Sequence, residues 1–283
     1  MDQQNNLQKQ NNYSMTQSTE IDQAKKFVEK HIKNTHHEKN NQQILLSANE
    51  IALSKYQVLN LSSSNWSWMP REWLLNANVN SEMYGLLAFI SLFASATPFY
   101  QDDNSIIISE ADLKKVLNIG WGSASNKFQE MMGTLKKVGY ISVDENHLVI
   151  NRPALNMTKQ GFVKIYATPV KLILSKTRGL KSLSLIAAYL AVRNSIFEGK
   201  THNRVLTSMN SGFSSASINM SSKNYSRKLK WLFDNDVLAW NKAIINSPYH
   251  QSVYYFSELH DADSLVKTLC NDILDETIIR LIA

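Results

Sequence analysis

The stretch that decides the fold is residues 109–150, SEADLKKVLNIGWGSASNKFQEMMGTLKKVGYISVDENHLVI. Its first four residues have the form of a capping box, which predicts the start of a helix. Gly120-Trp-Gly122 predicts a tight turn, and Phe128, Met132 and Leu135 recur at the i, i+4 and i+7 positions of a second helix. Two short β-branched runs separated by Asp-Glu-Asn follow, and this pattern predicts a hairpin.

One more helix and one strand precede this stretch. Ser81 followed by Glu82 predicts the start of a helix that runs to about Ala94, and the isoleucines at 106–108 predict a short strand. Helix, strand, helix, turn, helix and hairpin is the order of a winged helix, which is a helix-turn-helix with a β-hairpin appended. Residues 66–155 are therefore expected to form a first winged-helix domain.

The same order of elements recurs later in the chain, which indicates an internal repeat. The apolar pattern of the third helix reappears as Tyr225, Leu229 and Leu232, at a constant offset of 97 residues. Two runs rich in β-forming residues follow this helix and predict a second hairpin. Residues 156–256 are therefore expected to form a second winged-helix domain.

The two ends of the chain differ in composition from this central part. Residues 1–65 begin with a Gln- and Asn-rich run, and they are expected to be a disordered leader with one or two short helices. Residues 257–283 carry two basic and six acidic residues and are expected to form an acidic helical tail. The expected fold class is α+β, mainly α with small β-hairpins.

Charge is distributed unevenly along the chain. The whole protein has 30 basic and 24 acidic residues, but residues 151–256 hold 15 basic residues and only three acidic ones. A local field of this size attracts a polyanion. A solvated lysine-rich face is the alternative interpretation of the same bias.

The helix around Tyr225 carries its basic residues on the face opposite that tyrosine, at helical spacing. Arginine can bind guanine through two hydrogen bonds, asparagine can bind adenine, and lysine can bind phosphate. Serines at the start of the helix lie where exposed N–H groups can accept a phosphate. The residues expected to contact DNA in this second domain are Ser221, Ser222, Lys223, Asn224, Arg227 and Lys230.

Other residues are expected to support this contact or to make a weaker one. Backbone phosphates are expected to meet Lys176, Arg178, Lys181, Arg204 and Lys242. The third helix of the first domain carries Glu130 near the middle of its outer face, and phosphates repel a carboxylate. That domain is therefore ranked as a weaker DNA reader or a dimerisation module. Its expected contacts are Ser123, Asn126, Lys127 and Lys137.

Several classes of protein are excluded by the sequence. The Gly-x-x-x-x-Gly-Lys-Ser/Thr pattern of a P-loop is absent, and a single cysteine, Cys270, cannot form a cysteine-based zinc cluster. No catalytic constellation is recognisable, so the chain is expected not to be an enzyme and to need neither cofactor nor metal. No apolar run reaches the length of a membrane span, and no secretory signal is visible, so a cytoplasmic location is expected.

The layout resembles the tandem winged-helix replication initiators of bacterial plasmids and phages. The resemblance covers roughly residues 66–256 and rests on two winged units in series, on the openings Trp68-Met-Pro70 and Ala167-Thr-Pro169, and on the more basic second unit. It implies that the first unit mediates dimerisation and that the second contacts repeated origin sites. It also implies host replication proteins as partners.

Three functions remain open at this point. The first is a sequence-specific double-stranded DNA-binding protein that initiates plasmid or phage replication. The second is a transcriptional regulator with the same fold, because a fold does not determine function. The third is an adaptor that binds no DNA and whose basic face binds an acidic protein.

Overall fold

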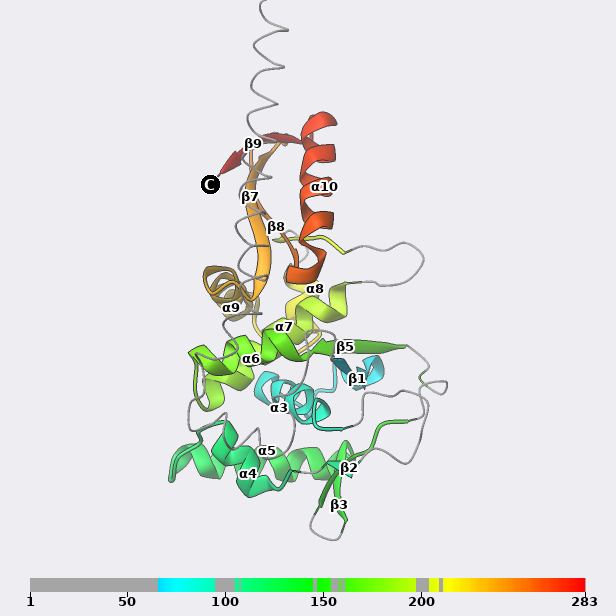
Figure 1. The fold of residues 1–283 in the computed structure, drawn as a ribbon, viewed down its shortest axis with the longest axis vertical. Helices are drawn as coiled ribbons and strands as arrows, with labels where there is room; N and C mark the ends of the chain where they lie inside the picture. Colours follow the sequence, from blue (N-terminus) through cyan, green and yellow to red (C-terminus); the bar gives the residue numbers. More distant parts are fainter. Residues whose placement is uncertain are drawn as a thin grey trace, which may run out of the picture. The chain divides into compact units, whose positions relative to one another are not determined.

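The computed structural model describes residues 66–94, 105–106, 108–144, 147–153, 158, 161–196, 204–208 and 211–282 (Figure 1). Within these residues the chain is α+β, with helices and antiparallel sheets, and the expected fold class is confirmed. The expected leader, residues 1–65, lies outside the described part of the chain.

The first repeat of elements runs from residue 66 to residue 150. It consists of β1 (Trp66–Pro70), the 3₁₀ helix η3 (Arg71–Trp73), α3 (Ser81–Ser91), β2 (Ser105–Ile106), α4 (Glu110–Val116), α5 (Ser123–Lys137), β3 (Ile141–Asp144) and β4 (His147–Ile150). The last three strands form an antiparallel sheet in the order β2-β4-β3. The strand after the first helix therefore pairs with the far strand of the hairpin.

The second repeat follows the same order and adds a strand at its end. It consists of β5 (Phe162–Tyr166), α6 (Ala167–Lys176), α7 (Leu180–Ser195), β6 (Leu206–Thr207), α8 (Ser211–Ala216), α9 (Ser222–Asp234), β7 (Leu238–Ile245) and β8 (Ser252–Glu258). After it come η6 (Leu259–Asp261), α10 (Ala262–Leu274) and β9 (Ile278–Ile282). The sheet order is β6-β8-β7-β9, so the first three strands correspond to β2-β4-β3.

Local side chains explain where the helices begin. The Ser109 hydroxyl accepts the backbone N–H of Asp112 at 3.1 Å, so the expected capping box does open α4. The cap of α3 lies one residue before the expected Ser81, because the Asn80 side chain accepts the backbone N–H of Met83 at 2.9 Å.

The C-terminal tail is not entirely helical, which corrects the expectation for residues 257–283. Its last described segment, β9, pairs antiparallel with β7. Ile278 and Leu281 of β9 are both buried. The register shifts beside Ile245, so one extra residue of β9 bulges out and lets both side chains face the core.

The described residues form two compact units whose boundaries differ from those expected at 155/156 and 256/257. Unit 2 holds the described residues of Gln43–Ser195 and Ser211–Leu232, and unit 1 holds those of Ile196–Asn210 and Phe233–Ala283. The reason is that the two repeats share a core. Strand β1 pairs with β5, and α3 packs against α7, as Figure 1 shows.

The contact between α3 and α7 is unusually close at one point. A Cβ atom on Gly85 of α3 would lie 1.9 Å from the carbonyl oxygen of Leu183 in α7. Almost every side chain of both helices is buried, because each helix covers a side of the other that an isolated repeat would leave exposed. Glycine at this position therefore sets the distance between the two repeats.

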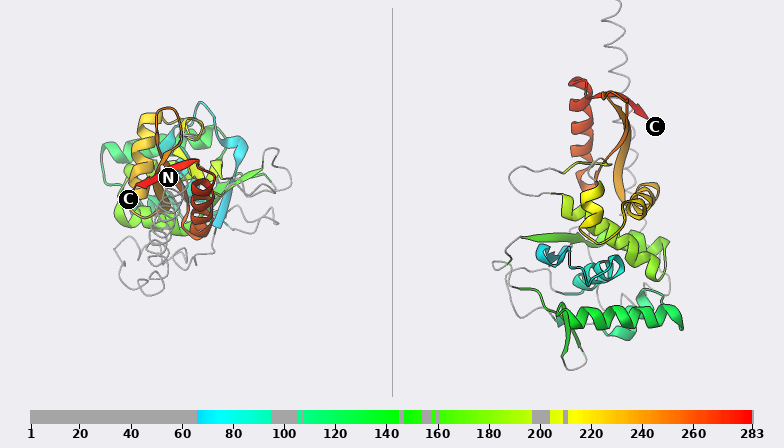
Figure 2. Two further views of the ribbon diagram at one scale, coloured as in Figure 1. Left: turned by 90° about the horizontal axis from the view of Figure 1, so that it is seen from above. Right: turned by 180° about the vertical axis from the view of Figure 1, so that it is seen from behind.

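Unit 1 has its own core between α10 and the sheet. Leu265 and Leu269 of α10 pack with Val253, Tyr255 and other side chains of β7, β8 and β9. Figure 2 shows α10 running along one face of the β7–β8 hairpin.

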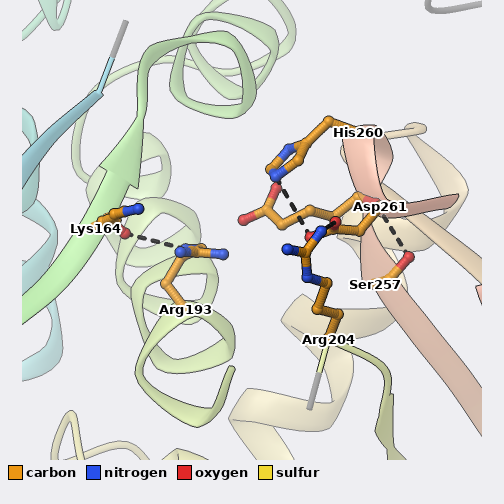
Figure 3. Close-up of polar contacts among 7 residues, drawn as sticks. Lys164, Arg193, Arg204, Ser257, His260 and Asp261 are labelled. Atoms are coloured by element: carbon orange, nitrogen blue, oxygen red, sulfur yellow. Dashed lines mark hydrogen bonds and ion pairs between the residues drawn. The ribbon is translucent and has the colours of Figure 1, made fainter. Parts of the chain in front are cut away.

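An ion pair ties the start of α10 to the segment before β6. Asp261 is 5% exposed, and its Oδ1 lies 2.7 Å from Nη1 of Arg204 (Figure 3). The second carboxylate oxygen lies 3.4 Å from Nε2 of His260. The Arg204 guanidinium therefore balances a buried carboxylate.

We predict that Gly85→Ala destabilises the protein. Overpacking of a filled core costs about 1–3 kcal/mol, and here the methyl group meets backbone that cannot rotate away. The matched control is Gly133→Ala in α5, where nothing lies within 4 Å of the new Cβ and the change favours the helix by about 1 kcal/mol. Urea unfolding measures both, and equal stability of the two variants would contradict the close contact.

We predict that Arg204→Ala lowers the free energy of unfolding by about 1–3 kcal/mol, because it leaves the buried Asp261 carboxylate without its guanidinium. Arg178→Ala, which removes the same charge from an exposed position, should change stability by less than about 0.5 kcal/mol. Thermal and urea unfolding of both variants provide the measurement. An Arg204→Ala protein as stable as the Arg178→Ala protein would show that the pair contributes nothing.

Candidate nucleic-acid interface

The outer face of α9 is open to solvent in the way that its periodicity predicts. Tyr225, Leu229 and Leu232 are 1%, 3% and 0% exposed, so one side of the helix is committed to the core. On the opposite side the exposed residues are Lys223, Asn224, Arg227 and Lys230. The side chains expected to contact DNA are therefore gathered on one accessible face.

Two of these side chains are joined to each other. Nη2 of Arg227 donates a hydrogen bond to Oδ1 of Asn224 at 3.1 Å, across one turn of the helix. This bond holds the guanidinium alongside the amide and leaves the other guanidinium donors available. A paired arginine and asparagine can present a preformed set of donors to base edges.

The serines at the start of α9 are partly engaged within the helix. The Ser221 hydroxyl accepts the backbone N–H of Asn224 at 3.4 Å, as a cap residue does. The Ser222 carbonyl accepts the hydroxyl of Ser226 at 2.9 Å. Both Ser221 and Ser222 are exposed, so their hydroxyls line the edge of the α9 face.

Lys228 was not expected to belong to the site, because helical spacing places it beside the apolar stripe. It is half-buried, and burial lowers its pKa below the usual value for lysine. The neighbouring cations Arg227 and Lys181 lower that pKa further, while Glu82 raises it. Lys228 therefore lies within electrostatic reach of each of these three charges.

Glu82 also reaches a residue of the first repeat. Its Oε1 lies 3.9 Å from Nζ of Lys127 in α5. The carboxylate at the start of α3 thus lies beside Lys127 of α5, and its charge also acts on Lys228 of α9; all of these residues belong to unit 2. We call this group the Glu82 patch, which consists of Glu82, Lys127, Lys181, Arg227 and Lys228.

The Glu82 patch brings together residues that the sequence placed in separate groups. Lys127 was expected in the first domain, Lys181 among the supporting contacts and Arg227 on the main helix. From the sequence, Glu82 is only a favourable acid in the first turn of α3. That role explains the residue without calling for a basic partner from another element.

Helix α5 presents a less basic face than α9. Phe128, Met132 and Leu135 are buried at 0%, 1% and 0% exposure, so the expected inward side is correct. The residues of this helix that are expected to contact DNA are exposed, and so is Glu130, namely Ser123, Asn126, Lys127, Glu130 and Lys137. A carboxylate therefore does stand in the middle of this face.

The five supporting residues divide into two groups. Lys176, Arg178 and Lys181 are exposed at the end of α6, in the following loop and at the start of α7. Arg204 is paired with Asp261, and Lys242 is half-buried with its Nζ 5.5 Å from the ring of Tyr254. Each of these last two cations has a partner in unit 1, and its contact with phosphate stays a prediction.

The sequence predicts Trp121 only as part of a tight turn. It is 99% exposed, between Gly120 and Gly122, directly before α5. Gly122 has a φ of +89°, which favours glycine, and it lets the chain turn sharply into the helix. A fully exposed tryptophan beside the first turn of α5 adds a large aromatic surface to that end of the helix.

Other kinds of site receive no support from the geometry. Among the described residues, no group of three or more His, Cys, Asp and Glu side chains could hold a metal ion. No helix in the described part of the chain is long and apolar enough to cross a membrane. No protein-family model matches this sequence, and neither a curated protein nor a solved structure is significantly similar to it.

Proposed function

We propose that this chain is a sequence-specific double-stranded DNA-binding protein built from two winged-helix repeats. The proposal is supported by the element order, because in both repeats a helix, a strand, two helices and a hairpin follow one another. It is also supported by the sheets, where β2-β4-β3 and β6-β8-β7 have the same strand order. In helix-turn-helix proteins of this kind, the helix before the hairpin enters the major groove.

The observation that carries the proposal is the exposed face of α9. It combines Lys223, Arg227 and Lys230 with Asn224, opposite a fully buried apolar side. These side chains supply both contacts to phosphate and hydrogen bonds to base edges. The first repeat contributes a weaker contact through α5, since Glu130 lies on its outer face.

The biological setting that we propose is replication initiation on a plasmid or phage, with recruitment of host replication proteins. It is supported by the arrangement of two such repeats in series with a more basic second one. A regulator of transcription is the second candidate, because the same fold and the same exposed face of α9 suit an operator equally well. Transformation with a plasmid that carries the gene's own locus separates the two, since only an initiator supports replication.

We predict that replacing Lys223, Arg227 and Lys230 together by glutamine weakens DNA binding at least 100-fold. Three lost contacts of about 1 kcal/mol or more each account for this change. All three side chains are exposed, so the unfolding midpoint should stay the same. Fluorescence anisotropy with DNA that flanks the gene measures the affinity, and an unchanged affinity in the folded variant would remove α9 from the interface.

The salt dependence of the same two proteins provides a second readout. Each phosphate contact contributes about −0.9 to the slope of log K against log salt, so the triple variant should have a shallower slope than the parent protein. A slope that does not change would mean that these side chains contact no phosphate. A parent protein with no affinity for duplex DNA at any salt concentration would favour the adaptor.

We predict a smaller loss of affinity, about tenfold, when Asn126 and Lys137 of α5 are both replaced by alanine. The reason is that Glu130 limits how closely the outer face of α5 approaches phosphates. The measurement is the same titration as for the triple variant, in the same buffer. A loss equal to or greater than that of the triple variant would reverse the ranking of the two helices.

A further inference from the structure

The turn before α5 is longer than the equivalent turn before α9. Helices α4 and α8 end with the same pair of backbone hydrogen bonds, whose donors are Asn118 and Ile119 in the first repeat and Asn219 and Met220 in the second. The two asparagines also share a left-handed backbone, with φ angles of 52° and 51°. The buried residue on the core side of the next helix is Phe128 in the first repeat and Tyr225 in the second. The first repeat therefore has four extra residues between these two points.

The extra residues are Gly120, Trp121, Gly122 and Ser123, and the second repeat joins α8 to α9 without them. They contribute nothing to the core, because all four are exposed and the Trp121 side chain is 99% exposed. Exposed tryptophan favours unwanted association, so protein surfaces carry few such residues beyond what binding requires. The insertion therefore displays a large aromatic side chain that the fold does not use.

Hydrogen bonds fix both ends of this insertion. Before it, Ile119 is buried, and its N–H donates to the carbonyl of Lys114 at 2.9 Å. After it, the carbonyl of Gly122 accepts the N–H of Asn126 at 3.1 Å. Nζ of Lys114 also donates to Oγ of Ser125 at 2.6 Å, and this bond joins α4 to the start of α5. A side chain on a fixed backbone loses less freedom on binding, so the indole is prepared for a ligand.

The second repeat brings cations to the same end of α4. The N–H of Gly179, in the loop between α6 and α7, donates to the carbonyl of Leu117 at 2.7 Å. Arg178 is exposed directly before this glycine, and Lys176 and Lys181 are exposed at the ends of the two helices that the loop joins. A backbone hydrogen bond therefore ties the turn that carries the exposed tryptophan to a basic loop.

The charges of the two joined segments favour nucleic acid over an acidic or neutral protein surface. Residues 113–129 contain three lysines, residues 163–197 contain six basic residues, and neither segment contains an aspartate or a glutamate. A field of one sign attracts a polyanion. Cations beside an aromatic ring can bind phosphates while the ring contacts a base. We therefore take DNA as the ligand of this turn.

A single exposed indole suits a base step of a duplex better than an unpaired strand. Proteins that bind single strands stack successive bases on several aromatic side chains along a groove. In the described part of unit 2, Trp121 is the one aromatic side chain that is exposed rather than buried or half-buried. Proteins that kink a duplex, by contrast, insert individual apolar side chains between neighbouring base pairs and partly unstack them.

We propose that Trp121 is a wedge that enters one base step of duplex DNA and kinks the duplex there. This inference rests on the proposed function, and it gives the insertion a role separate from hydrogen bonds to base edges. Pyrimidine–purine steps unstack most easily, so the wedge selects a TA, CA or TG step through the deformability of the DNA. An indole neutralises no phosphate, so its contribution to affinity does not depend on salt.

The test compares the full-length parent protein with Trp121→Ala and Trp121→Leu on the duplex that it protects in DNA flanking the gene. 2-Aminopurine at successive positions of this duplex becomes fluorescent where a step is unstacked, and dyes at the two ends report the bend by energy transfer. We expect the parent to unstack one step and to bend the duplex by at least about 20°. The alanine variant should lose both effects and bind about tenfold more weakly. The leucine variant should keep most of them, since leucine also serves as a wedge.

Two controls separate the wedge from other effects of the substitution. The unfolding midpoint of Trp121→Ala should equal that of the parent, because the side chain is almost fully exposed. Leu274→Ala removes an exposed apolar side chain from α10 and should change neither affinity nor bend. The slope of log K against log salt should be the same for all of these proteins.

Three results would overturn the inference while DNA binding itself stands. The first is unchanged affinity and unstacking in the folded Trp121→Ala protein, which would leave the turn to a protein ligand. The second is a shallower salt slope in that variant, which would mean that the turn only positions phosphate contacts. The third is weaker binding of that variant to single-stranded oligonucleotides, with no unstacked step in the duplex. A parent protein that protects no duplex would instead overturn the proposed function, and the inference with it.

Discussion

The structure depends on the contact between α3 and α7, where the backbone of Leu183 occupies the space that a side chain at position 85 would need. This contact brings the two helices together, beside the pairing of β1 with β5. Because protein interiors are close-packed, a shift of α3 or of α7 would disturb the contacts between the two repeats. Glycine at position 85 is therefore required by the core that the two repeats share.

Sequence periodicity was sufficient to assign the buried and exposed sides of helices whose two sides differ in polarity. Helices α5 and α9 alternate buried and charged residues at helical spacing, so Phe128 and Tyr225 could be assigned to the core and Arg227 to solvent. Helix α3 is apolar on all sides, and this composition indicates burial without indicating the partner. Gly85 looks like an ordinary weak point in a helix until the opposite backbone is known.

Long-range pairing was the part that sequence could not specify. The expected domain boundary at 155/156 assumed that each repeat closes its own core, whereas β1 finds its partner in β5. The C-terminal strand was missed because Ile278 and Ile279 also fit the apolar side of an amphipathic helix, whereas the pairing of β9 with β7 places them in a sheet. Arg204 and Glu82 were assigned roles from their own segments, and their partners Asp261, Lys127 and Lys228 come from other elements.

The shared core also governs the order of events while the chain is being synthesised. Translation delivers α3 and β1 long before α7 and β5, so the first repeat leaves the ribosome with an uncovered helix face and an unpaired strand edge. Such edges and apolar faces readily associate with other nascent chains. The first repeat can complete its core only after α7 and β5 have been synthesised. This delay favours rapid elongation through α7 or protection by a chaperone during that interval.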